Sequence, residues 1–204
     1  MRTHTILALA ACMFLLLAWK AVTPGYEVGE TVSGFKLKNF DGKMVALSDY
    51  SDFKGVILIF DCNTCPYSKA YNDRIISLHK NYAPKGFPVI TINANDGELS
   101  PGDAFPEMVA RARNKKYDFP YLLDDTQRVA RAFGATNTPH VFVLKREGKD
   151  FVVSYIGTID NNSRNGAKAD KKYVEDAVNA LLKGNPVPVE RTRAIGCGIK
   201  WRDA

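Results

Sequence analysis

The hydrophobic pattern is strongest where the chain reads Val56-Ile57-Leu58-Ile59-Phe60, with an apolar residue at every position. A run of this kind is typical of a strand that is covered on both faces, as in parallel α/β sheets. A second apolar run at residues 87–92 predicts another strand. Upstream, Asp41-Gly42 separates residues 32–40 from 43–47 and predicts the turn of a β-hairpin.

Helical spacing follows the strand at 56–60. Four apolar side chains recur at i, i+4, i+7 and i+11 and therefore lie on one face of a helix, namely Tyr71, Ile75, Leu78 and Tyr82. The same reasoning predicts helices near 105–112, 126–133 and 173–182, a short extended piece at 121–123, and paired strands at 140–144 and 151–156. The order predicts an α/β fold, with a central mixed sheet flanked by helices and an N-terminal β-hairpin.

The N-terminus has the pattern of a targeting segment. Arg2 precedes an apolar run at residues 6–19, which has the length of a signal peptide and is short for a membrane span. Residues 1–21 are therefore expected to be a signal peptide or a membrane anchor; cleavage, lipidation at Cys12 and retention all remain open. We expect one domain over residues 22–204, including a C-terminal tail at 185–204, in an exported protein.

Composition and charge limit the classes of binding partner that the sequence predicts. The 204 residues are 46% hydrophobic and 25% charged, which is ordinary for a globular protein. The net charge of +6 is not gathered into a basic run, so no nucleic-acid partner is predicted. No glycine-rich nucleotide-binding motif appears, and no cofactor is predicted. A membrane is expected to be contacted only through the N-terminal segment.

Candidate chemistry gathers at Cys62 and Cys65, directly after the strand at 56–60 and before the first helix. A cysteine reacts as its thiolate, and the amide groups at a helix N-terminus favour that anion. Cysteines at this spacing can attack a disulfide and resolve the product. Pro66 leaves the start of the helix open, because proline suits the first helical position but a start at Cys62 would place it fourth.

Several other residues are candidates for supporting roles. Asp61 is placed to accept a proton beside Cys62 or to cap the loop. Thr138-Pro139 opens a strand, and His140 could tune the cysteines or shuttle a proton. Cys197 could be a further redox thiol that resolves a disulfide, a structural thiol or an intermolecular partner. A tetrahedral zinc site needs about four ligands, and the sequence offers no second closely spaced pair.

These motifs together resemble the thioredoxin-fold redoxins of the alkyl hydroperoxide reductase/thiol-specific antioxidant (AhpC/TSA) family, over roughly residues 26–183. A peroxiredoxin-like thioredoxin subgroup shares four motifs with this chain: Cys-Asn-x-Cys-Pro-Tyr at 62–67, Asn-x-Asn-Asp at 93–96, Thr-Pro-His at 138–140 and Gly-Cys-x-Ile-Lys-Trp at 196–201. The resemblance implies a thioredoxin-like fold. It also implies that Thr138–Pro139 is a cis peptide packed against the cysteines, where it presents backbone to the substrate and discourages metal binding.

The chain departs from the usual motifs of both thioredoxins and peroxiredoxins. Asp61 stands where thioredoxins have a tryptophan, and Cys62 stands where peroxiredoxins have a threonine. We expect a thiol–disulfide oxidoreductase of the bacterial periplasm or cell envelope, acting on protein dithiols and disulfides. The alternatives are a thiol peroxidase acting on hydrogen peroxide or organic peroxides, and a copper- or zinc-handling protein. Attack by Cys62 is favoured over attack by Cys65, because thioredoxin-like pairs usually expose the first cysteine.

Overall fold

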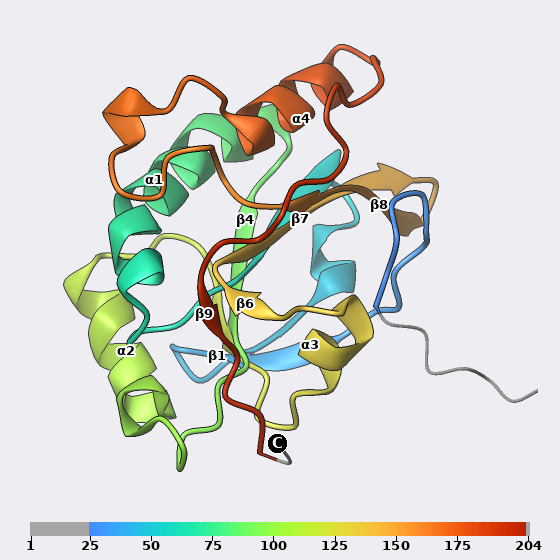
Figure 1. Ribbon diagram of the computed structural model, residues 1–204. Helices are drawn as coiled ribbons and strands as arrows, with labels where there is room; N and C mark the ends of the chain where they lie inside the picture. The colour runs from blue at the N-terminus through green and yellow to red at the C-terminus, as the bar shows by residue number, and fades with distance from the viewer. Residues whose placement is uncertain (1–24, 203–204) are drawn as a thin grey trace, which may run out of the picture.

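The computed structural model describes residues 25–202. Its main sheet has seven strands in the order β2-β1-β5-β4-β3-β7-β8, and β6 and β9 form a separate pair (Figure 1). The strands are β1 (Lys36–Asn39), β2 (Met44–Ala46), β3 (Gly55–Phe60), β4 (Val89–Asn93), β5 (Tyr121–Leu123), β6 (Asn137–Thr138), β7 (His140–Glu147), β8 (Asp150–Gly157) and β9 (Cys197–Gly198). The helices are α1 (Pro66–Tyr82), α2 (Phe105–Asn114), α3 (Arg128–Phe133) and α4 (Tyr173–Leu182). The predicted mixed sheet with flanking helices is confirmed.

Strand β3 lies at the centre of the fold, and all six of its residues are buried. It runs parallel to β4 on one side and antiparallel to β7 on the other. Successive side chains of a strand point to opposite faces. Accordingly, Ile57 and Ile59 pack in the cluster that includes α1 and α4, whereas Phe60 packs in the cluster that includes α3. The predicted covering of both faces explains why this strand lacks polar positions.

Helix α1 begins at Pro66, with Cys65 as the residue before its first turn. The backbone of Cys65 is extended, with φ −63° and ψ 125°, which is the conformation that a following proline favours. Proline has no N–H to leave unsatisfied at the first helical position. The open question about the helix start is thereby decided, and Cys62 lies in the loop between β3 and α1.

The C-terminal tail was not predicted to form a strand. It returns across the molecule and β9 pairs antiparallel with β6, so that Thr138 lies opposite Cys197 (Figure 1). The predicted hairpin is present in β1 and β2, and the short extended piece at 121–123 joins the main sheet as β5. The targeting segment expected at residues 1–21 lies outside the described residues. Between residues 25 and 202, no helix is long and apolar enough to cross a membrane.

Candidate active site

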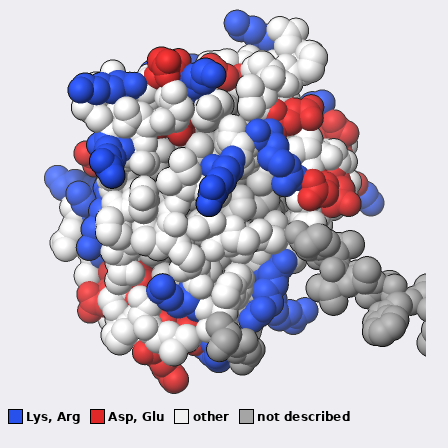
Figure 2. Space-filling view, viewed as in Figure 1, with Lys and Arg blue, Asp and Glu red and all other residues white. Residues whose placement is uncertain are grey.

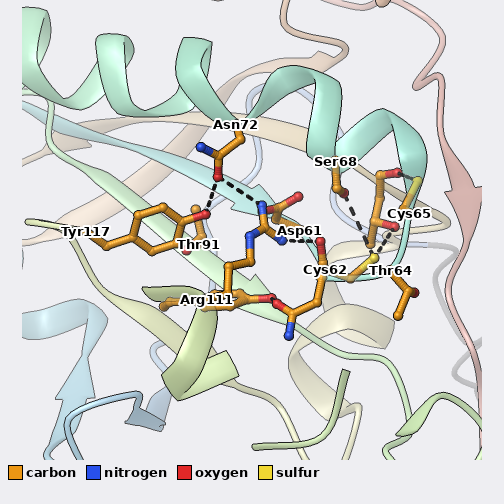
Figure 3. Close-up of polar contacts among 12 residues, drawn as sticks. Asp61, Cys62, Thr64, Cys65, Ser68, Asn72, Thr91, Arg111 and Tyr117 are labelled. Atoms are coloured by element: carbon orange, nitrogen blue, oxygen red, sulfur yellow. Dashed lines mark hydrogen bonds and ion pairs between the residues drawn. The ribbon is translucent and has the colours of Figure 1, made fainter. Parts of the chain in front are cut away.

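The loop between β3 and α1 places both cysteines of the Cys-x-x-Cys pair inside the protein, with 1% of Cys62 and 2% of Cys65 exposed. The Sγ of Cys62 lies 3.1 Å from the Oγ1 of Thr138 and 3.9 Å from the Oγ of Ser68. Figure 3 shows Ser68 on α1 facing the sulfur of Cys62. Each hydroxyl group can donate a hydrogen bond to this thiol or accept one from it.

The Thr138–Pro139 peptide is cis, as the resemblance implied. Thr138 is fully buried, and it contacts both cysteines: its hydroxyl reaches Cys62 and its carbonyl oxygen lies 3.0 Å from the Sγ of Cys65. Pro139 follows directly and leads into β7. Thr138 therefore lies against both cysteines, whereas the predicted role of Pro139 stays a prediction.

The two thiols have very different acidities. The hydrogen bond from the Cys62 thiol lowers the pKa of Cys65 to about 4, and hydrogen bonds from Cys197 and from the amide of Ser68 act in the same direction. Burial opposes this shift, and the nearby Thr138 carbonyl favours the thiol form in which Cys65 donates to it. The same shared hydrogen, together with burial, raises the pKa of Cys62. Near neutral pH the geometry thus favours a thiolate at Cys65 and a thiol at Cys62.

The expectation that Cys62 attacks first rested on its exposure. Exposure does not separate the two sulfurs, because both are almost completely buried. Charge does separate them, since Cys65 at the start of α1 is the stronger acid. The exposure of the two sulfurs therefore does not indicate which of them attacks first. The lower pKa of Cys65 favours Cys65 as the attacking thiolate.

Cys197 lies at the same place. Its Sγ is 2.7 Å from the Sγ of Cys65, and its backbone N–H donates to that sulfur at 3.4 Å. Burial and the contact with Cys65 raise the pKa of Cys197 to about 11. Gly196 allows the close approach, because a Cβ there would lie 2.1 Å from the carbonyl oxygen of Thr138. Three cysteines, rather than two, meet at the site.

The tail that carries Cys197 is held by the motif at residues 93–96. Asn95 accepts from the amide of Lys200, and Asp96 forms an ion pair with Arg202 at 2.6 Å. Gln127 completes the attachment by donating to the carbonyl oxygen of Lys200 and accepting from the amide of Arg202. Asp96 also accepts hydrogen bonds from the amides at 98 and 99, which stabilises the turn that follows it. The sequence motifs at 93–96 and 196–201 thus contact each other.

Behind Cys62 lies a buried ion pair that joins Asp61 to Arg111 of α2 at 2.9 Å (Figure 3). Arg111 also donates to the carbonyl oxygen of Cys62 and, at 3.3 Å, to the side chain of Asn72, which accepts from Tyr117. Burial raises the pKa of Asp61, and the charge of Arg111 offsets part of that effect. Asp61 was predicted beside the cysteines and lies there, but its predicted role as proton acceptor stays a prediction.

Asp103 fixes the loop that carries the cysteines. Its carboxylate accepts from the amides of Asn63 and Thr64 and from the hydroxyls of Thr64 and Ser100, and Asn95 donates to it as well. Burial would raise the pKa of Asp103, but these hydrogen bonds outweigh it and hold the pKa below its usual value. An ionised carboxylate suits this position, because only acceptors are needed there.

His140 is buried, as a candidate site residue should be, but its contacts lie elsewhere. Its Nδ1 accepts from the amide of Thr136 at 3.3 Å, and its ring lies against that of Phe142. Burial lowers its pKa to about 4, so it is neutral near neutral pH. Over the described part of the chain, no hydrogen bond joins His140 to a cysteine, and its predicted role stays untested. Within residues 25–202, no three His, Cys, Asp or Glu side chains are arranged so that they could hold a metal ion.

Sequence reasoning missed Arg111 and Asp103. A signal for Arg111 was present, because it lies between Met108 and Ala112 on the apolar face of α2, where an arginine needs a buried partner. Asp103 carried no such signal, since Ser100-Pro101-Gly102-Asp103 reads as an ordinary turn.

Known proteins resemble this chain in sequence and in structure. Thiol-disulfide oxidoreductase ResA from Bacillus subtilis is 24% identical over 147 residues, which cover 71% of this chain and 78% of that protein. The crystal structure of an uncharacterized conserved protein from Geobacillus kaustophilus matches with a TM-score of 0.81 and 35% identity, covering 88% of this chain and 94% of that one. Peroxidoxin BcpB from Mycobacterium tuberculosis matches at 0.58 with 20% identity, covering 78% and 97%, which shows the fold alone.

The predicted thioredoxin-like fold is confirmed by these structures. The model of the AhpC/TSA family matches residues 28–156, which is well over half of the chain and includes β3, the Cys-x-x-Cys loop and the cis-proline. The resemblance seen in the motifs is thereby confirmed, and the chain belongs to the AhpC/TSA family.

Proposed function

We propose that the protein is a thiol–disulfide oxidoreductase whose reacting groups are Cys62 and Cys65. The observation that carries this proposal is that Cys62 and Cys65, at the junction of β3 and α1, both contact Thr138 beside the cis proline; the opposite pKa shifts of the two thiols support it. One sulfur is ready to attack as a thiolate, and the other holds a proton beside it. The name of the Bacillus subtilis relative, a thiol-disulfide oxidoreductase, supports the same chemistry.

In the proposed reaction, the Cys65 thiolate attacks one sulfur of a disulfide in a partner protein. A mixed disulfide forms, and the partner's other sulfur leaves as a thiolate. Cys62 then loses its proton and attacks the Sγ of Cys65, which releases the partner as a dithiol and leaves a Cys62–Cys65 disulfide. Two electrons pass from the cysteine pair to the partner, followed by two protons. A second dithiol protein restores the pair by exchange in the reverse sense.

Neighbouring residues position this exchange. Asp103 holds the amides of Asn63 and Thr64, and so fixes the distance between the two sulfurs. Arg111 holds the carbonyl oxygen of Cys62 and pairs with Asp61, whose negative charge raises the pKa of the Cys62 thiol. Thr138 contacts both sulfurs from the opposite side. Each of these is a positioning residue for the pair.

We place this reaction outside the cytoplasm, in the periplasm or cell envelope of a bacterium. The support is the signal-like pattern of Arg2 and the apolar run at residues 6–19, together with the persistence of disulfides in oxidising compartments. Residues 1–21 would then be the only contact with a membrane.

A thiol peroxidase is the second candidate, because the low pKa of Cys65, about 4, gives the thiolate that peroxide reduction requires. The hydroxyl group of Thr64 is not available to a peroxide at Cys65, since it donates to Asp103 at 2.7 Å. Cys62 occupies the position of the peroxiredoxin threonine. The oxidoreductase therefore fits these residues better.

Thiol mapping separates the two candidates. The reduced full-length protein is mixed either with insulin, as a disulfide-bonded probe, or with hydrogen peroxide; it is then quenched in acid, alkylated and analysed by mass spectrometry. A fast Cys62–Cys65 disulfide with insulin and a slow reaction with peroxide is the expected result, and Cys65→Ser should abolish it. Sulfenic acid at Cys65 that forms faster than the reaction with insulin would instead identify a peroxidase. No reaction at either cysteine would contradict both candidates.

A further inference from the structure

Access to the cysteine pair poses a problem that the third sulfur can solve. With the tail in place, Cys62 and Cys65 are 1% and 2% exposed, so attack by Cys65 on a partner disulfide and direct attack by a dithiol protein on the Cys62–Cys65 disulfide both require the tail to move aside. Cys197 is only partly buried, and it touches Cys65 with 2.7 Å between the two sulfurs. Cys197 is thus the one part of this three-sulfur cluster that is reached from solvent in the described structure.

We propose that Cys197 is a third redox sulfur, which takes the disulfide bond from the buried pair and presents it at the surface to an incoming dithiol protein. This inference rests on the proposed function, because it starts from the Cys62–Cys65 disulfide. It assigns to the tail a chemical role, beyond covering the site.

The exchange balances without an external oxidant. Cys197 loses its proton and attacks the Sγ of Cys65 in the Cys62–Cys65 disulfide; the Cys65–Cys197 bond forms, the Cys62–Cys65 bond breaks, and Cys62 leaves as a thiolate that takes up a proton. An incoming dithiol then attacks the sulfur of Cys197, and Cys65 leaves as a thiolate. The second thiol of the incoming protein resolves the mixed disulfide, and the three cysteines end reduced.

The backbone already holds Cys197 close to its bonding position. Thr138 and Cys197 are directly paired across β6 and β9, and Asn137 donates to the carbonyl oxygen of Gly196 at 3.0 Å. A disulfide bond is about 2.05 Å long, so the observed separation of 2.7 Å must shorten by less than about 1 Å. The attachments of Lys200 and Arg202 fix the tail on the other side of Cys197.

The acidities favour attack at the partly exposed Cys197. In a disulfide, the sulfur with the lower pKa is the better leaving group, so the other sulfur is the one attacked. Cys65 has a pKa of about 4 and Cys197 a pKa of about 11, so a nucleophile should attack Cys197 and release Cys65. In the Cys62–Cys65 disulfide, by contrast, both sulfurs are buried. Transfer to Cys197 therefore moves the reactive sulfur from the interior to the surface.

The surface around β6 and β9 suits a protein partner. Figure 2 shows that the part of this face where β6 and β9 lie in Figure 1 is mostly uncharged, with basic and acidic side chains scattered around it. A surface with few charged groups at its centre is typical of protein interfaces. An incoming dithiol protein can thus approach Cys197 without desolvating a cluster of charges.

Two measurements on the full-length protein test the proposal. First, reduced Cys62→Ser protein is treated with oxidised glutathione and its disulfides are mapped; we expect an intramolecular Cys65–Cys197 bond. Second, wild type and Cys197→Ser are both oxidised to the Cys62–Cys65 disulfide, and their reduction by dithiothreitol is timed. Serine keeps a hydroxyl donor beside Cys65, so the variant differs from wild type mainly in lacking the sulfur of Cys197. We expect the Cys197→Ser disulfide to be reduced at least about tenfold more slowly than that of wild type.

Ile195→Ser is the matched control, since it alters an exposed tail residue and leaves all three sulfurs in place. It should be reduced at the wild-type rate. Equal reduction rates for Cys197→Ser and wild type would overturn the proposal, as would a Cys62→Ser protein that stays glutathionylated at Cys65. A wild-type protein that never forms the Cys62–Cys65 disulfide would instead refute the proposed function, so the two failures are distinguishable.

Discussion

Removal of Arg111 should expose how much the fold depends on the charge buried behind Cys62. The Arg111 and Asp61 side chains are 11% and 1% exposed and lie 2.9 Å apart. Loss of one member of a buried ion pair strands the other charge and typically costs about 3–5 kcal/mol. We therefore expect Arg111→Met to lower the free energy of unfolding by about 3–5 kcal/mol at pH 7. Asp61 also has a buried Oδ1 without a hydrogen-bond partner in the described residues, so its carboxylate is incompletely satisfied even with Arg111 present.

The pH dependence gives this prediction a definite sign. Burial already raises the pKa of Asp61 above its ordinary 3.8, and loss of Arg111 raises it further. An acid whose folded-state pKa is raised binds more protons when folded, so its contribution is present below 3.8 and is lost as pH rises through the folded pKa. The deficit of Arg111→Met should therefore grow from pH 5 to pH 8 by about 1.4 kcal/mol for each unit of additional pKa shift in that interval.

Urea unfolding at several pH values measures these quantities. Asp61→Asn combined with Arg111→Met removes both charges, and the double variant should be more stable than the sum of the single losses by about 0.5–3 kcal/mol. The exposed pair Lys145–Glu147, with side chains 46% and 53% exposed, is the control. Lys145→Met should cost no more than about 1 kcal/mol. A pH-independent loss below about 1 kcal/mol for Arg111→Met would refute the reasoning.

Three further predictions follow from the site. Iodoacetamide labelling of Cys65, over the pH range in which the protein stays folded, should show a midpoint near its pKa of about 4, and Cys62→Ala should raise that midpoint because the main stabilising hydrogen bond is lost; an unchanged midpoint would contradict the assignment. Asp103→Ala should cost about 2–5 kcal/mol in urea unfolding, since the amides of Asn63 and Thr64 lose their acceptor, whereas exposed Asp52→Ala should have little effect. Gly196→Ala should displace the tail, because its Cβ would lie 2.1 Å from the Thr138 carbonyl oxygen, and should therefore speed labelling of Cys65; labelling at the wild-type rate would show that the tail does not cover it.

The elements that the sequence predicted well are those with a local period. In β3 every residue is buried, and in α1 the buried residues recur once per helical turn, as Tyr71, Ile75 and Leu78 do. Both patterns are visible in the sequence. The strand β9 has only two residues, too few for any period to appear. Its pairing depends on Gly196, whose importance comes from a contact with Thr138 that is distant in sequence.

The part of the site that residue type and spacing identify could be predicted from the sequence. Cys62, Cys65 and Thr138-Pro139 were found because their spacing and order are distinctive, and the structure brings them together with Cys197. The acidity of Cys65 could not be foreseen, since it depends on which neighbour shares a hydrogen with which sulfur. Asp103 was missed because a turn aspartate and a loop anchor look alike in sequence.

The pairing of β9 with β6 also has a consequence for biosynthesis. Cys65 and Cys197 are 132 positions apart, and the attachments of the tail extend to Arg202. Because a chain is synthesised from its N-terminus, Cys62 and Cys65 emerge long before the segment that covers them. The growing polypeptide therefore carries an uncovered thiol pair until the tail segment has been made, and the site closes only once β9 is available to pair with β6.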